Sequence, residues 1–171
     1  LSISALTLYH EDGEKLIEDF ITENKTHPKA VLAYYELGNY YFQQKSYTKA
    51  IEYYEKVNQT LITSEERAET RYKLGYSYFT KRNFNEALKK FNLLKREKDV
   101  YGYASAYYAG YIEYENGEYD KAINDLERAR QSESYAAIVP GMLANLYYKQ
   151  GRYDELKTYS EAVLKGSRRE I

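Results

Sequence analysis

Apolar and aromatic residues recur along this chain three and four positions apart, which is the spacing of residues on one face of an α-helix. Turn-forming residues such as Asn116 and Gly117 separate these stretches. Within each long stretch, a small residue is followed twelve residues later by another small residue in the next stretch. The clear pairs are Gly38 with Ala50, Gly75 with Ala87 and Gly110 with Ala122, and a weaker fourth copy pairs Ala144 with Leu156.

The second members of these pairs follow one another at intervals of 37, 35 and 34 residues. A period in this range is typical of stacked helix pairs, because one pair cannot bury its own apolar face and must pack on a neighbour. The pattern therefore predicts an all-α fold, a solenoid of antiparallel helix pairs. The predicted helices span residues 12–25, 30–44, 47–58, 64–81, 84–96, 101–115, 119–131, 136–149 and 153–165.

The same spacing divides the chain into repeats. Counting back one period from Ala50 reaches Leu16, so a partial, degenerate repeat is expected before the four full ones. Because the repeat is regular in the middle and irregular at both ends, and because the sequence starts with Leu1 rather than Met, we expect a single solenoid that is a fragment of a longer protein. The predicted repeats span residues 1–28, 30–62, 64–98, 100–133 and 136–166.

Three glycines fall inside predicted helices, at Gly38, Gly75 and Gly110. Glycine in a helix costs about 1 kcal/mol relative to alanine. We expect a close approach between each glycine and the paired alanine of the second helix to offset that cost. We also expect Tyr54 and Phe91, four residues beyond the alanine, to pack on the next repeat.

Two further signals place helix ends. Thr63 and Glu66 have the spacing of a capping box, which predicts a helix that begins near Ser64. Pro140 lies near the start of the eighth predicted helix, where a proline in the first turn loses no hydrogen bond. We therefore expect that helix to begin at about residues 136–139.

These positions resemble the tetratricopeptide repeat. The first two full copies match the pattern of that family well. The third departs from it, with Glu113 where a tyrosine is expected and Leu126 where an aromatic residue is expected, and the fourth has Ala144 for the glycine and Leu156 for the alanine. The resemblance covers about residues 16–165 and implies a right-handed superhelical solenoid. The matching residues are Tyr34, Leu37, Gly38, Tyr41, Ala50 and Tyr54 in one copy and Leu74, Gly75, Tyr78, Ala87 and Phe91 in the next.

The resemblance also implies that peptides bind to a concave groove lined by the first helix of each pair. Most of the positions implied for this groove are aromatic. Their rings either form an exposed binding surface or fill the space between adjacent first helices. Some members of the family bind the C-terminal carboxylate of a partner with a lysine at the position where this chain has Tyr35. We therefore do not expect this chain to bind a partner's C-terminus in that way. The positions implied for the groove are Tyr35, Asn39, Phe42, Tyr72, Tyr76, Phe79, Tyr107, Tyr111, Tyr114, Asn145 and Tyr148.

Charge and composition narrow the function classes. The chain carries 25 Lys and Arg against 26 Asp and Glu, so it lacks the excess of positive charge that strengthens binding to nucleic acid or to anionic membranes. Neither is therefore expected as a partner. No apolar run is long enough to insert in a membrane. The chain has no Cys, only two His and no phosphate-binding or nucleophile motif. We therefore expect neither an enzyme, nor a bound cofactor, nor a metal site.

The sequence thus predicts a non-catalytic scaffold that binds an as yet unidentified protein or peptide. The alternative is an architectural module that self-associates through its end faces, because Leu156, Tyr159 and Val163 line the last helix with nothing after them. A glycan or small-molecule site on the tyrosines is a third possibility. The tyrosine-rich texture is similar to repeat proteins of Bacteroidetes cell envelopes, which implies a periplasmic or envelope location.

Overall fold

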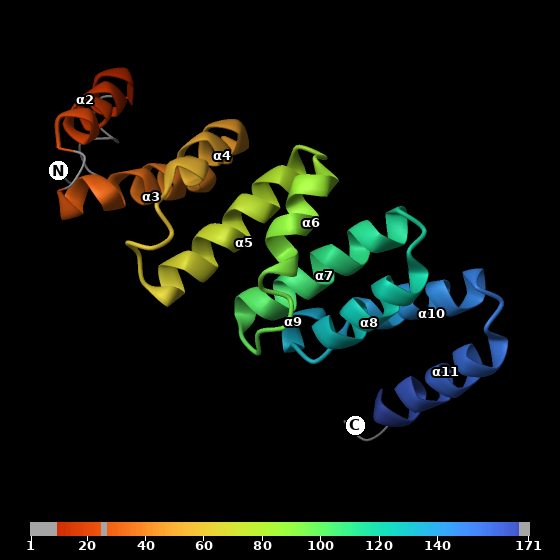
Figure 1. Ribbon diagram of the computed structural model, residues 1–171. Helices are drawn as coiled ribbons and strands as arrows, with labels where there is room; N and C mark the ends of the chain where they lie inside the picture. Colours follow the sequence, from red (N-terminus) through yellow and green to blue (C-terminus); the bar gives the residue numbers. More distant parts are fainter. Residues whose placement is uncertain (1–9, 25–26, 168–171) are drawn as a thin grey trace. The chain divides into compact units, whose positions relative to one another are not determined.

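The computed structural model describes residues 10–24 and 27–167, and every regular element in these residues is an α-helix (Figure 1). The all-α prediction is therefore confirmed. The helices are α2 (His10–Glu23), α3 (Pro28–Gln43), α4 (Tyr47–Lys56), α5 (Ser64–Thr80), α6 (Phe84–Asn92), α7 (Val100–Glu115), α8 (Tyr119–Ala129), α9 (Glu133–Ala136), α10 (Val139–Lys149) and α11 (Tyr153–Ser167).

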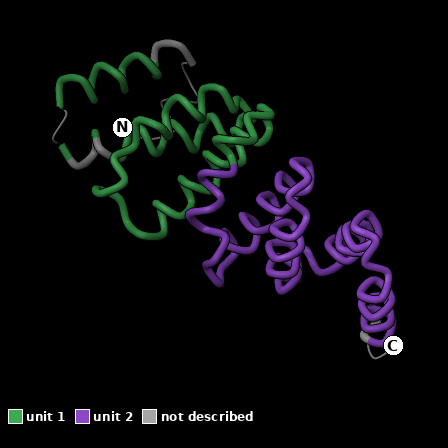
Figure 2. Tube along the Cα trace, turned by 45° about the vertical axis from the view of Figure 1, so that its right-hand side comes forward, with its two compact units in different colours: residues 1–87 green, residues 88–171 purple. Residues whose placement is uncertain are grey.

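The chain divides into two compact units, residues 1–87 and 88–171 (Figure 2). In unit 1, α3 packs against α4, α4 against α5, and α2 against α3. In unit 2, α7 packs against α8, α8 against α10, and α10 against α11. These contacts join consecutive helices into antiparallel pairs, as the period predicts. Where each repeat begins and ends stays a prediction.

The turns inside the helix pairs share one backbone structure. In each turn, one residue has a positive φ, and the next residue donates its N–H back to the carbonyl five positions earlier. This arrangement ends a helix by satisfying its last carbonyls. The residues with positive φ are Lys45 (57°), Arg82 (60°), Gly117 (77°) and Gly151 (68°).

The structure differs from the predicted helices in two main places, apart from shifts of one to three residues at other helix ends. The helix predicted over residues 84–96 ends at Asn92, because the chain leaves the helix through turns before α7. The short helix α9 was not predicted, because four residues are too few to show a helical period. Pro140 lies in the first turn of α10, as predicted, and that helix begins at Val139.

The helix glycines make room for a different neighbour from the one expected. A Cβ atom on Gly38 would lie 2.4 Å from a ring carbon of Tyr54, and one on Gly110 would lie 2.8 Å from Cγ of Leu126. Both neighbours are four residues beyond the paired alanine and are buried inside the same helix pair. The Tyr54 ring therefore packs on its own first helix. At Gly110 the helices do approach closely, since the carbonyl oxygen of Ala122 would lie 3.2 Å away.

The predicted capping box is present at the start of α5. Thr63 Oγ1 accepts from the N–H of Glu66 at 3.2 Å, and Glu66 Oε2 accepts from the N–H of Thr63 at 2.8 Å. We expect Thr63→Ala to lower the free energy of unfolding by about 1 kcal/mol, because the N–H of Glu66 loses its acceptor and the Glu66 carboxylate loses the hydroxyl that donates to it. Urea denaturation would measure the loss, with the exposed neighbour change Ser64→Ala as its control. Equal stabilities of the two variants would contradict this role.

Candidate functional site

In unit 1, partly exposed aromatic rings from three helices form one connected cluster. Phe42 of α3 meets Tyr76 of α5 edge to face, with ring centroids 5.8 Å apart. Tyr47 of α4 lies 5.8 Å from Phe42 and 6.0 Å from Tyr76. Tyr72 adds a fourth ring 6.3 Å from Tyr76. This ring cluster (Phe42, Tyr47, Tyr72 and Tyr76) brings together three of the predicted groove residues.

A polar network lies beside the ring cluster. Asn39 Oδ1 accepts from the Tyr54 hydroxyl at 2.7 Å and from Lys73 Nζ at 2.8 Å. Lys73 also forms an ion pair with Glu69 at 2.5 Å, and the Tyr35 hydroxyl donates to Glu69 at 2.5 Å. Burial opposes ionisation of Glu69, but the hydrogen bonds from Lys73 and Tyr35 outweigh it and lower the pKa of Glu69. The lysine charge is thus neutralised within the network.

Besides Asn39, which belongs to the polar network, two predicted groove residues of unit 1 lie outside the ring cluster. Tyr35 is only 8% exposed, and burial, followed by its bond to Glu69, raises the pKa of its hydroxyl. Its ring therefore contributes mainly to packing. Phe79 is partly exposed and contacts Phe84, with the ring centroids 5.5 Å apart.

In unit 2, neighbouring side chains partly cover the predicted positions on α7. Tyr107 stacks on Tyr135 of α9 at 4.6 Å, a contact that sequence reasoning missed because α9 gave no signal. Lys149 of α10 places its ammonium group 4.4 Å from the centroid of Tyr114. Tyr111 is partly exposed.

Among the predicted groove residues, the two on α10 are the most exposed to solvent. Asn145 is exposed, and Tyr148 is 64% exposed. Tyr148 meets Tyr153 of α11 edge to face at 6.0 Å. In unit 2 the predicted rings take part in several ring contacts, with Tyr107 against Tyr108 and Tyr135, Tyr114 against Tyr119, and Tyr148 against Tyr153. In unit 1, three of the predicted residues meet in one cluster.

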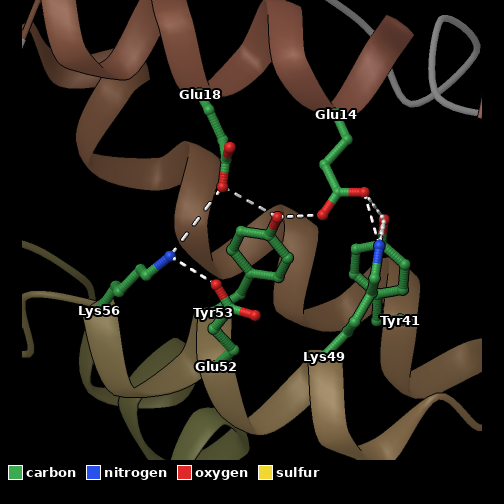
Figure 3. Close-up of polar contacts among 7 residues, drawn as sticks. All are labelled: Glu14, Glu18, Tyr41, Lys49, Glu52, Tyr53 and Lys56. Carbon is green, nitrogen blue, oxygen red and sulfur yellow. Dashed lines mark hydrogen bonds and ion pairs between the residues drawn. The ribbon is translucent and has the colours of Figure 1, made fainter. Parts of the chain in front are cut away.

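A second polar cluster of unit 1 holds α2 in place (Figure 3). The Glu14 carboxylate accepts hydrogen bonds from the hydroxyls of Tyr41 and Tyr53 and from Lys49 Nζ, at 2.6 Å from Tyr41 and 2.7 Å from Lys49. Burial opposes ionisation of Glu14, but these donors prevail and lower its pKa. The cluster comprises Glu14, Glu18, Tyr41, Lys49, Glu52, Tyr53 and Lys56.

Among the residues that the structure describes, no three or more His, Cys, Asp or Glu side chains are grouped so that they could hold a metal ion. Within the same residues, no helix has the length and apolar character needed to cross a membrane.

Comparison with models of known families identifies the family to which the repeats belong. One model described as tetratricopeptide repeat matches residues 31–57, and a second with the same description matches residues 72–137 and 110–155. Together these matches cover more than half of the chain. The chain belongs to the tetratricopeptide repeat family. The resemblance drawn from the spacing of Gly38 and Ala50 is thus confirmed, and repeats of this family generally mediate protein–protein contacts and are typically non-catalytic.

Solved structures support the tetratricopeptide repeat solenoid. The crystal structure of MamA is similar at 22% identity and a TM-score of 0.68, covering 92% of this chain and 88% of that chain. A Podosopora anserina putative kinesin light chain with nearly identical TPR-like repeats is similar at 20% identity and a TM-score of 0.60, covering 85% and 79%. Identities this low establish the fold alone. No curated protein matches the sequence significantly.

Proposed function

We propose that this tetratricopeptide repeat chain is a non-catalytic scaffold that binds a peptide or protein segment through aromatic rings on the first helices of its pairs. The observation that carries the proposal is the ring cluster of unit 1. Four partly exposed rings from α3, α4 and α5 lie in one connected group. Rigid aromatic side chains bury a large area at a low entropic cost, so such a group is suited to recognition.

The polar network beside the rings indicates the chemistry of the partner. Lys73 is neutralised by Glu69, and Asn39 Oδ1 already accepts two hydrogen bonds. A charged anchor on the partner would have to break these bonds and leave a partly buried group without its partner. We therefore expect a segment whose contact residues are apolar or aromatic and uncharged.

The alternative functions have less support. In α11, Leu156, Tyr159 and Val163 are partly buried, and Tyr159 packs on the core of unit 2 beside Tyr147. Tyr153 and Leu164, at 62% and 63% exposed, are the large apolar residues left open on that helix among its described residues. Single exposed apolar residues are ordinary on a protein surface, so self-association through this end is the weaker proposal.

The test is a selection of short random peptides displayed on phage against the purified chain. Peptides that are selected should bind the Tyr76→Ala variant at least tenfold more weakly, because truncating a central aromatic hot spot costs about 2 kcal/mol or more. Tyr111→Ala would show whether unit 2 contributes. Fluorescence anisotropy with labelled peptides gives the dissociation constants.

The matched control is Tyr153→Ala, which removes a 62% exposed ring that lies outside the ring cluster. Thermal melting of all three variants separates lost binding from lost folding. Failure to select any peptide would reject the proposal, as would selected peptides that bind Tyr76→Ala as tightly as the parent chain.

A further inference from the structure

Corresponding positions in two helix pairs hold side chains of opposite character. In the first pair, the residues three beyond Gly38 and Ala50 are Tyr41 and Tyr53, whose rings stack 5.5 Å apart. In the third pair, the residues three beyond Gly110 and Ala122 are Glu113 and Asp125. A site that holds two neutral rings in one pair therefore holds two carboxyl groups in another.

Glu113 is deeply buried, with only 2% of its surface exposed. Its Oε1 lies 3.2 Å from Lys95 Nζ, and the same ammonium group lies 2.5 Å from Oδ2 of Asp125. The second oxygen of Glu113, Oε2, is buried and has no hydrogen-bond donor within the described residues. Thus one lysine serves two carboxyl groups, and one carboxyl oxygen is left over.

The surrounding charges leave this imbalance uncorrected. Lys121 of α8 pairs with Glu118 at the start of that helix. The guanidinium of Arg128 is directed to the backbone carbonyl of Arg96. Glu113 shares an open cleft of about 490 Å³ with Lys95, Arg96, Glu118 and Lys121, so water can reach the lysine that joins the two acids.

The energetics favour a neutral Glu113. Burial, followed by the charge of Asp125, raises the pKa of Glu113 to about 7, against the opposing effect of Lys95. The ion pair with Lys95 alone would lower it, but a buried carboxylate pays a large desolvation cost, and a second carboxylate beside it adds repulsion. A protonated Glu113 can instead donate a hydrogen bond to Asp125, which removes the repulsion.

We propose that Glu113 and Asp125 together hold one proton next to Lys95, and that loss of this proton weakens the packing of α7 against α8. The pair is then a proton-sensing site inside unit 2. Because α7 also carries Tyr111 and Tyr114, the site would link pH to the predicted groove positions of unit 2; this last link rests on the proposed function. The proton site itself does not depend on it.

The direction of the pH effect follows from the raised pKa. A carboxyl group whose pKa is higher in the folded chain stabilises the fold fully below its unfolded value, and that contribution is lost as the pH rises through the folded value. Unit 2 should therefore lose stability as the pH rises from about 4.5, the ordinary pKa of a glutamate, to about 7, and the Glu113 contribution should change little above that. Glu14 responds in the opposite sense, because its pKa is lowered.

The first test is a titration of the carboxyl carbons of the parent chain by NMR, from about pH 3 to about pH 9. We expect the Glu113 carbon to titrate near neutrality, well above the ordinary range of a glutamate. In Asp125→Asn the titration of Glu113 should move to lower pH, because the repulsion is removed. A Glu113 carbon that titrates in the ordinary glutamate range, at about pH 4, would overturn the proposal.

The second test compares the stability of Glu113→Gln with that of the parent across the same range. Glutamine mimics the protonated acid, so the variant should lack the loss of stability on raising the pH, which reaches up to tenfold in the folding equilibrium constant per pH unit for one proton. Glu115→Gln is the control and should keep the parent profile. Identical profiles in Glu113→Gln and the parent would also overturn the proposal. Neither readout uses a peptide, so failure here is distinct from failure of the proposed function.

Discussion

Replacing Gly102 by alanine is expected to lower the free energy of unfolding by about 3 kcal/mol. A Cβ atom at this position would lie 2.1 Å from the backbone carbonyl oxygen of Glu97 and 2.7 Å from its carbonyl carbon. A backbone atom cannot rotate away as a side chain can, so either α7 or the segment before it must shift. That shift would also strain the cap of α7, where Asp99 Oδ1 accepts from the N–H of Gly102 at 2.7 Å.

Two other glycines supply a graded comparison. A Cβ on Gly141, in the first turns of α10, would meet nothing within 4 Å, so Gly141→Ala should be neutral or stabilising by up to about 1 kcal/mol. Gly38→Ala should fall between them, because its obstacle is the buried ring of Tyr54 rather than backbone. Urea denaturation followed by circular dichroism would rank the three variants. If Gly102→Ala were as stable as Gly141→Ala, the prediction would be contradicted, because the backbone before α7 would then move aside at little cost in free energy.

These glycines show what the sequence could and could not predict about the fold. Gly38 and Gly110 stand out because they recur at the repeat period. Gly102 does not recur, and its constraint comes from the path of the chain from α6 into α7, which no periodicity describes. The identity of the residue facing Gly38 was mispredicted for a related reason. Spacing fixes which face a residue occupies, but the side chain that fills the gap depends on the packing of both helices.

The same limit applies to the candidate site. Reading positions from each glycine predicted Phe42, Tyr72 and Tyr76, which the structure joins in the ring cluster. It also predicted Tyr35, which is buried, because the pattern cannot tell a ring that faces solvent from one that fills a gap. The sequence showed that Glu113 replaces an expected tyrosine. It could not reveal Lys95 as the partner, since that contact depends on the non-helical segment after α6.

Replacing Tyr53 by alanine is expected to lower the free energy of unfolding by about 3–5 kcal/mol, the usual cost of removing a buried aromatic side chain. Tyr53 is 1% exposed, and its ring stacks on Tyr41 at 5.5 Å. Its hydroxyl donates to Glu14 and lies 3.1 Å from Glu18, so the variant also removes a donor that holds α2 (Figure 3). Hydrogen exchange should therefore show faster exchange of the α2 amides as well as lower global stability.

The conservative change Tyr53→Phe separates the two contributions. It keeps the stacked ring and removes only the hydroxyl, so it should cost about 1–3 kcal/mol, the penalty for a carboxylate that loses a buried donor. Faster exchange in α2, with the core of α3 and α4 still protected, would identify the hydroxyl bond as the contact that docks α2. Tyr153→Ala, which removes an exposed ring, should leave both properties nearly unchanged. If Tyr53→Phe left α2 as protected as in the parent chain, apolar contacts such as those of the buried Ile21 would be sufficient to dock that helix, and the polar cluster would not be needed for it.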